Sequence, residues 1–162
     1  MITFSRVGIR ISQDYNPMDI DTQTSLLSQK EYEDKTYLAD FMMVAEGDVF
    51  LSRKDYKIAA GLLNYGQALT HRIMTTKGNH PRDRTLGIEW NKYLGQSYIS
   101  KSMVIAELST ELEEEIYRDY RTSEVTYIDI EFLNENTLKI ETGVIPIDSN
   151  EEVVLTLTAK EA

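Results

Sequence analysis

Hydrophobic and polar residues alternate near both ends of the chain, whereas the middle follows a helical period. Residues 2–11 and 125–133 show the two-residue period of strands with one buried face. Between them, apolar residues three or four positions apart predict an amphipathic helix that begins at Ser100 or Ser102. This apolar stripe consists of Ile105, Leu108, Leu112 and Ile116.

The C-terminal part of the chain predicts a small sheet. The strand over residues 125–133 enters a turn at residues 134–136 and continues as a second strand over residues 137–143, which is the pattern of a hairpin. A further run over residues 153–158 can add a third strand at the edge of that sheet.

A second helix is predicted over residues 64–77, upstream of the first. Asn64 is a suitable N-cap, and apolar residues follow it at helical spacing. Gly78 supplies the left-handed residue that ends many helices. Behind it, Pro81 stiffens the turn and Gly87 permits a second tight bend, so this segment predicts a rigid corner.

The segments before this helix are less regular. Residues 12–36 are polar and lack a sustained period, which indicates an arm that becomes ordered on a partner. The apolar runs 38–44 and 49–51 predict a hairpin. We therefore divide the chain into an N-terminal strand and polar arm, residues 1–36, and a single folded domain, residues 37–162.

The only tryptophan lies in a short predicted helix within residues 88–99, which Gly95 closes. Trp90 fits two roles, because a large ring with one polar atom suits both a core and an interface anchor. Core packing is the favoured interpretation.

The overall composition narrows the class of protein. The 162 residues are 41% hydrophobic and include no cysteine, so one compact domain without disulfides is expected. Neither a leader for secretion nor a membrane span is indicated. The net charge of −10 argues against nucleic acid as a partner.

The charge is unevenly distributed along the chain. Residues 58–102 hold six basic and two acidic side chains, whereas residues 103–162 hold four basic and fifteen acidic ones. Such asymmetry favours either oriented association with partners or folding of the basic segment against the acidic helix.

No pattern in the sequence indicates catalysis or a bound metal or cofactor. Four glutamates lie close together on the predicted helix, at Glu111, Glu113, Glu114 and Glu115. They are expected to share one solvated face, where two carboxylates cannot acquire the different pKa values that a glycan hydrolase needs. Glu114 is expected to pair with Arg118 four residues later. His71 and His80 lack the spacing of a metal site.

The order of several short motifs resembles one family. Glu46–Leu51 has the form of a Gly-Asp hairpin, and Gln67, Arg72, Thr75, Gly78, Pro81 and Gly87 follow it in the order seen in the baseplate wedge subunit, or sheath initiator, of contractile phage tails. The resemblance covers about residues 38–147. Many relatives carry Glu-Pro-Arg between the long helix and the next strand, where this chain reads Thr122-Ser123-Glu124.

The resemblance implies an α+β fold with a small mixed or antiparallel sheet, two main helices and an extended N-terminal arm. It also implies a structural subunit, six copies per tail, in the virion tail baseplate and assembled in the host cytoplasm. Its partners would be the other wedge proteins, the tail sheath protein and the tail tube, with no membrane, and its mechanism would be strand addition to an open sheet edge. A related type VI secretion baseplate and, in another class, a cell-wall glycan hydrolase are the alternatives. The candidate partner-binding residues are Gln67, Arg72, Arg82, Arg84, Trp90, Val153, Leu155 and Leu157.

Overall fold

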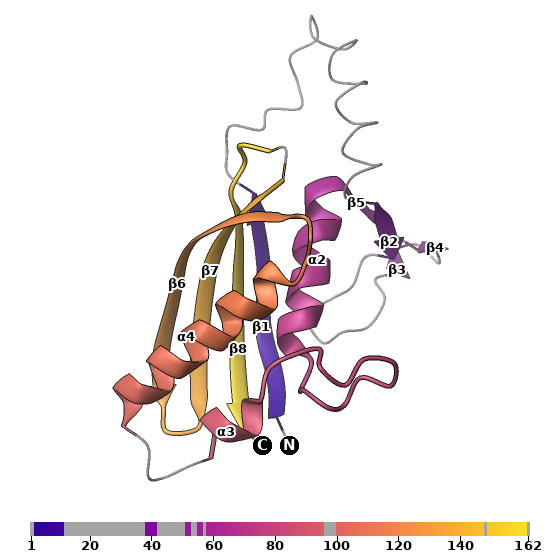
Figure 1. The fold of residues 1–162 in the computed structure, drawn as a ribbon. Helices are drawn as coiled ribbons and strands as arrows, with labels where there is room; N and C mark the ends of the chain where they lie inside the picture. Colours follow the sequence, from indigo (N-terminus) through magenta and orange to yellow (C-terminus); the bar gives the residue numbers. More distant parts are fainter. Residues whose placement is uncertain are drawn as a thin grey trace, which may run out of the picture.

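A four-stranded antiparallel sheet with two helices on one face forms the body of the protein (Figure 1). This computed structural model describes residues 2–11, 38–41, 51–52, 55–56, 58–95, 100–147 and 149–161. The α+β prediction is confirmed. The polar arm predicted over residues 12–36 lies outside the described residues.

The hairpin predicted over residues 125–143 forms one half of the sheet, with one of its strands at the sheet edge. β6 (Thr122–Asn134) and β7 (Thr137–Pro146) pair in antiparallel register, and both extend beyond the predicted strands. The Asn134 side chain accepts a hydrogen bond from the Asn136 amide at 2.9 Å, which fixes the turn between them. Local alternation and turn chemistry were therefore sufficient to predict this unit.

The third C-terminal strand is internal, which corrects the expectation that it forms the sheet edge. β8 (Val153–Glu161) pairs with β7 on one side and with β1 (Ile2–Ile11) on the other, in the strand order β1-β8-β7-β6. The N-terminal strand, predicted correctly, thus joins the sheet beside the C-terminal strand and occupies the side that was expected to be free.

The first long helix begins earlier than predicted. α2 spans Gly61–Met74, with Ala60 at the N-cap position, so Asn64 is not a cap but lies buried inside the helix. The helix ends before Thr75, and Gly78 adopts a φ of +89° in the loop behind it. Gly78 therefore shapes the corner and does not terminate the helix directly.

The second long helix matches the sequence pattern closely. α4 spans Lys101–Tyr117 with Ser100 at the N-cap position, although the Ser100 hydroxyl contacts the Ser102 hydroxyl at 2.7 Å and makes no capping bond. Its buried apolar residues are Val104, Leu108, Leu112 and Ile116, and Ile105 is only partly buried. The short helix α3 (Trp90–Tyr93) is also present, ahead of Gly95 with its φ of +78°.

The described short strands pair differently from the predicted hairpin. β2 (Ala39–Phe41) pairs with β5 (Ile58–Ala60), and β3 (Leu51–Ser52) pairs with β4 (Asp55–Tyr56). The described part of the run that begins at Leu38 thus pairs with the strand directly before α2, and Leu51 pairs with Tyr56. The turn of the predicted hairpin, including the Gly-Asp pair, lies outside the described residues.

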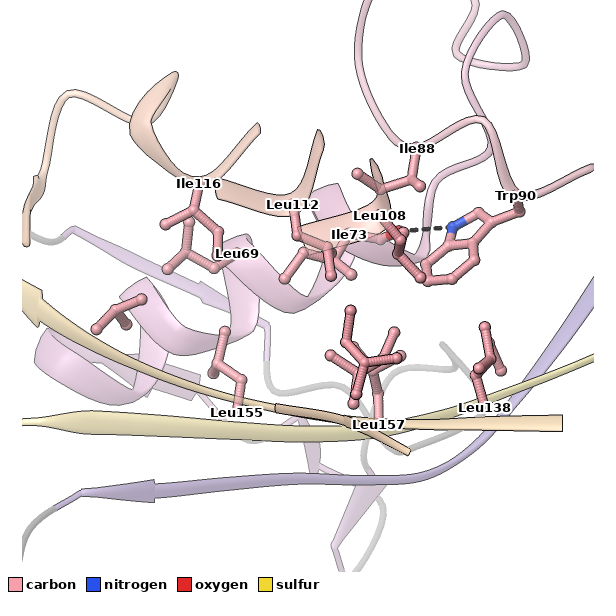
Figure 2. Packing of buried hydrophobic residues seen from close by; sticks show 14 of the residues in the cluster. Leu69, Ile73, Ile88, Trp90, Leu108, Leu112, Ile116, Leu138, Leu155 and Leu157 are labelled. Atoms are coloured by element: carbon pink, nitrogen blue, oxygen red, sulfur yellow. Dashed lines mark hydrogen bonds between the residues drawn. The ribbon is translucent and has the colours of Figure 1, made fainter. Parts of the chain in front are cut away.

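The core lies between the two long helices and the inner face of the sheet. In Figure 2, Leu108, Leu112 and Ile116 of α4 face Leu138, Leu155 and Leu157 of the sheet, with Leu69 and Ile73 of α2 beside them. At one end of this layer the Trp90 indole N–H donates a hydrogen bond to the Ile73 carbonyl at 2.9 Å (Figure 2). The core interpretation of Trp90 is therefore correct, since its exposed fraction is 0%.

Candidate partner-binding surfaces

The corner after α2 is held by backbone hydrogen bonds at its base. The Ile88 amide donates to the Thr75 carbonyl at 2.9 Å, and the Lys77 amide donates to the Ile88 carbonyl at 3.0 Å. Within the corner, the Gly78 amide donates to the Arg84 carbonyl at 3.0 Å. The predicted rigid corner is confirmed as a closed, internally bonded loop, which can present side chains in a fixed arrangement.

Gly87→Ala should destabilise this corner more than Gly78→Ala. Both glycines have positive φ, +96° and +89°, so an added Cβ strains either backbone by about 1–2 kcal/mol. At Gly87 the Cβ would also collide with the Thr75 carbonyl, whereas at Gly78 it would meet no atom within 4 Å. We expect Gly87→Ala to lower the free energy of unfolding by at least about 1 kcal/mol more than Gly78→Ala in urea unfolding. Equal losses of unfolding free energy in the two variants would contradict the predicted collision at Gly87.

A buried glutamate ties this corner and α2 to α4. Glu115, 2% exposed, accepts a hydrogen bond from Arg72 at 2.9 Å and one from Arg118 at 3.0 Å. The same Arg118 guanidinium donates to the Thr85 carbonyl of the corner at 2.8 Å. The predicted pair of Arg118 with Glu114 is wrong, because the guanidinium turns inward to the glutamate three residues before it.

The candidate residues of α2 are wholly or partly buried, whereas those of the corner are exposed. Arg72 forms an ion pair with Glu115, and Gln67 is buried at 8% exposure. Arg82 and Arg84 lie exposed on the corner. Between them, the Asp83 carboxylate accepts hydrogen bonds from the Thr85 amide and hydroxyl, and the hydroxyl bond is first among the causes that lower the pKa of Asp83.

The glutamates of α4 do not share one environment, contrary to the sequence prediction. Glu113 and Glu114 are exposed, Glu115 is buried, and Glu111 is partly buried. Glu111 accepts hydrogen bonds from the Glu89 amide at 2.9 Å and the Tyr93 hydroxyl at 2.6 Å. The carboxylates of Glu111 and Glu115 thus bind residues of neighbouring elements to α4, and these contacts explain why both are at least partly buried.

Among the residues that the structure describes, neither histidine sits in a cluster of metal ligands. Burial lowers the pKa of His71, and the nearby Asp40 charge opposes this effect. The His80 ring accepts a hydrogen bond from the Asp83 amide at 3.0 Å. No group of three or more potential ligands occurs among the described residues. No helix within the described residues has the length and hydrophobicity needed to span a bilayer.

A buried ion pair lies at the junction of α4 and β6. The Arg121 guanidinium donates two hydrogen bonds to Asp119, at 2.6 and 2.9 Å, and lies 5.5 Å from the centre of the Tyr65 ring. Because β6 already begins at Thr122, the tripeptide before it is Asp119-Tyr120-Arg121. Thr122-Ser123-Glu124, expected between the long helix and the next strand, are therefore the first residues of β6.

The two edges of the sheet are β1 and β6, and β6 is a strand that the sequence predicted but did not identify as the edge for strand addition. No described strand pairs with its outer side. Near its start, the Val125 amide donates to the Tyr117 hydroxyl at 3.2 Å. Val153, Leu155 and Leu157, chosen because β8 was expected at the edge, are instead buried between the sheet and the helices.

The comparison with known protein families agrees with these elements. Residues 35–149 match the family model described as contractile injection system sheath initiator, a span that includes both long helices, the corner, β6 and β7. No individually curated protein matches the chain.

Proposed function

Because the chain belongs to the contractile injection system sheath initiator family, we propose that it is a baseplate wedge subunit that starts the sheath by strand addition to β6. The resemblance in the sequence is thus correct at the level of the family, and a role in sheath initiation follows from it. The wedge location and the strand-addition mechanism are the proposal, as are six copies per tail and a purely structural role.

The observation that carries the mechanism is that no described strand pairs with the outer side of β6. An exposed strand edge offers a row of backbone donors and acceptors to which an extended segment can pair, while alternating side chains set its register. Register shifts interrupt β6 near both ends, but the residues from Tyr127 to Phe132 pair regularly with β7. This run has the regular geometry that an added strand needs.

The opposite edge of the sheet is a poorer template. β1 contains a register shift between Ser5 and Gly8, which divides it into two regular runs of four residues each. Such a bulge twists an edge and discourages pairing. We therefore assign the addition of the sheath strand to the β6 edge and not to the β1 edge.

The corner would then face the other wedge proteins. Arg82 and Arg84 are exposed there on a closed loop, and guanidinium groups bind carboxylates through paired hydrogen bonds. The network from Arg72 through Glu115 to Arg118 holds the corner against α4, so wedge contacts and the sheath edge belong to one connected unit.

Hydrogen exchange of the full-length protein with and without its cognate sheath protein tests the mechanism. The amides of β6 should exchange more slowly in the complex, by about tenfold or more, because added hydrogen bonds protect them. The β1 amides are the internal control and should keep their rates. A complex that protects β1, or that leaves β6 unchanged, would exclude strand addition at this edge.

A further inference from the structure

A groove lies between α4 and the free edge of β6. Its deeper part, about 230 Å³, is lined by Ser109, Thr110, Glu113, Val125, Tyr127 and Ile128. Thr110 and Glu113 also line a second hollow of about 600 Å³ that continues along α4, together with Glu114, Tyr117 and Arg118. A strand added to β6 would therefore run beside a furrow whose other wall is α4.

The wall formed by α4 carries negative charge that the described protein does not neutralise. Glu113 and Glu114 are exposed and form no ion pair with any residue that the structure describes. Arg118, at the end of the groove, is already paired with Glu115 and bonded to Thr85. Positive charge on a bound segment would thus find free carboxylates here.

Two of the residues that line the groove on the β6 side are apolar, Val125 and Ile128. Val125 and Ile128 point to the inner face of β6 and pack partly against the core. Lysine and arginine suit such a site, because their methylene stems cover apolar surface while the charged end reaches a carboxylate. An acidic or purely apolar segment would leave the glutamates without a counter-charge.

We infer that this groove selects a basic strand: a lysine or arginine on the inner face of the added segment lies over Ile128 and pairs with Glu113. This rests on the proposed strand addition and names the chemistry of its partner. Neighbouring strands lie about 4.8 Å apart, so the inner side chain opposite Ile128 starts directly above the groove. Because the Tyr117 hydroxyl already accepts a hydrogen bond from the Val125 amide, pairing begins beyond that residue, in the regular run that contains Ile128.

Three labelled ten-residue peptides can test the selection with the full-length protein. They share an alternating threonine and valine sequence and carry two lysines, two glutamines or two glutamates on one face. At low salt, fluorescence anisotropy should show that the lysine peptide binds about fivefold tighter than the glutamine peptide, with the glutamate peptide weakest. Hydrogen exchange of the lysine complex should show protection of β6.

Matched variants locate the effect. Replacing Glu113 and Glu114 together with glutamine should reduce the preference for the lysine peptide to less than about twofold. Glu135→Gln, an exposed change in the β6–β7 turn, should preserve it. Both proteins should retain the wild-type circular dichroism.

The outcomes separate this inference from the proposed function. Equal binding of the lysine and glutamine peptides with protection of β6 would overturn the charge selection and leave strand addition supported. A preference for the lysine peptide without protection of β6 would also overturn the claim that the groove selects a basic strand. A preference that survives removal of both carboxylates would overturn it too. If no peptide bound or protected β6 at millimolar concentration, both this selection and the assignment of the edge would be wrong.

Discussion

Replacing Trp90 with alanine should lower the free energy of unfolding by about 3–5 kcal/mol. The indole is fully buried, and its ring meets the Phe4 ring edge-on with centroids 5.3 Å apart. Its N–H also satisfies the Ile73 carbonyl at the end of α2. Truncation would leave a cavity where β1, α2 and α3 meet, and would leave that carbonyl without its indole partner.

Chemical unfolding followed by circular dichroism measures this loss, because the variant lacks the only tryptophan. Trp90→Phe keeps most of the ring but removes the donor, so its loss should be clearly smaller than that of the alanine variant. Tyr120→Ala, at a side chain that is 76% exposed, should change stability by no more than about 0.5 kcal/mol. A loss of less than about 1 kcal/mol in Trp90→Ala would contradict the packing role.

The elements predicted best are those defined by local sequence. α4 and the β6–β7 hairpin follow from residues that are close together in the chain, because periodicity and turn chemistry act over short distances. The position of β8 depends instead on Ile2–Ile11, whose pairing joins the two ends of the chain. No local signal states which of several alternating strands will lie next to another.

The start of α2 shows the opposite limitation, in which a local signal was misleading. Asn64 is a good cap by residue type, yet the short strand β5 passes into the helix at Gly61, which adopts a φ of +61°. Gly66 packs closely against Ile9 and Val153, so the helix is positioned by contact with the sheet. Tertiary packing therefore overrode capping preference.

The candidate surfaces could be predicted only in part. The exposed arginines of the corner follow from its turn residues, since Pro81 and Gly87 indicate a rigid loop. Glu115 looked like its exposed neighbours, and only the positions of Arg72 and Arg118 explain why it is buried. The free edge at β6 could not be identified until the neighbour of β8 was known.

Asp119→Asn should cost about 3 kcal/mol at pH 7, because it removes the Asp119 charge that pairs with the buried Arg121 guanidinium. Burial by itself would raise the pKa of Asp119, but hydrogen bonds and charge from Arg121 outweigh it and hold that pKa below its usual value. Asp129→Asn, the same change at an exposed site on β6, is the control and should stay within about 0.5 kcal/mol.

The cost of Asp119→Asn should depend on pH in one direction. A carboxylate whose pKa is lower in the folded protein stabilises it fully above the unfolded pKa of about 3.9 and loses this contribution as pH falls toward the folded pKa. The difference in unfolding free energy between wild type and Asp119→Asn should therefore be constant from about pH 7 to 5 and shrink below about pH 4. Urea unfolding at a series of pH values measures it. A difference that grew on acidification would mean that Asp119 is protonated in the folded protein, and the ion pair at the start of β6 would then be wrong.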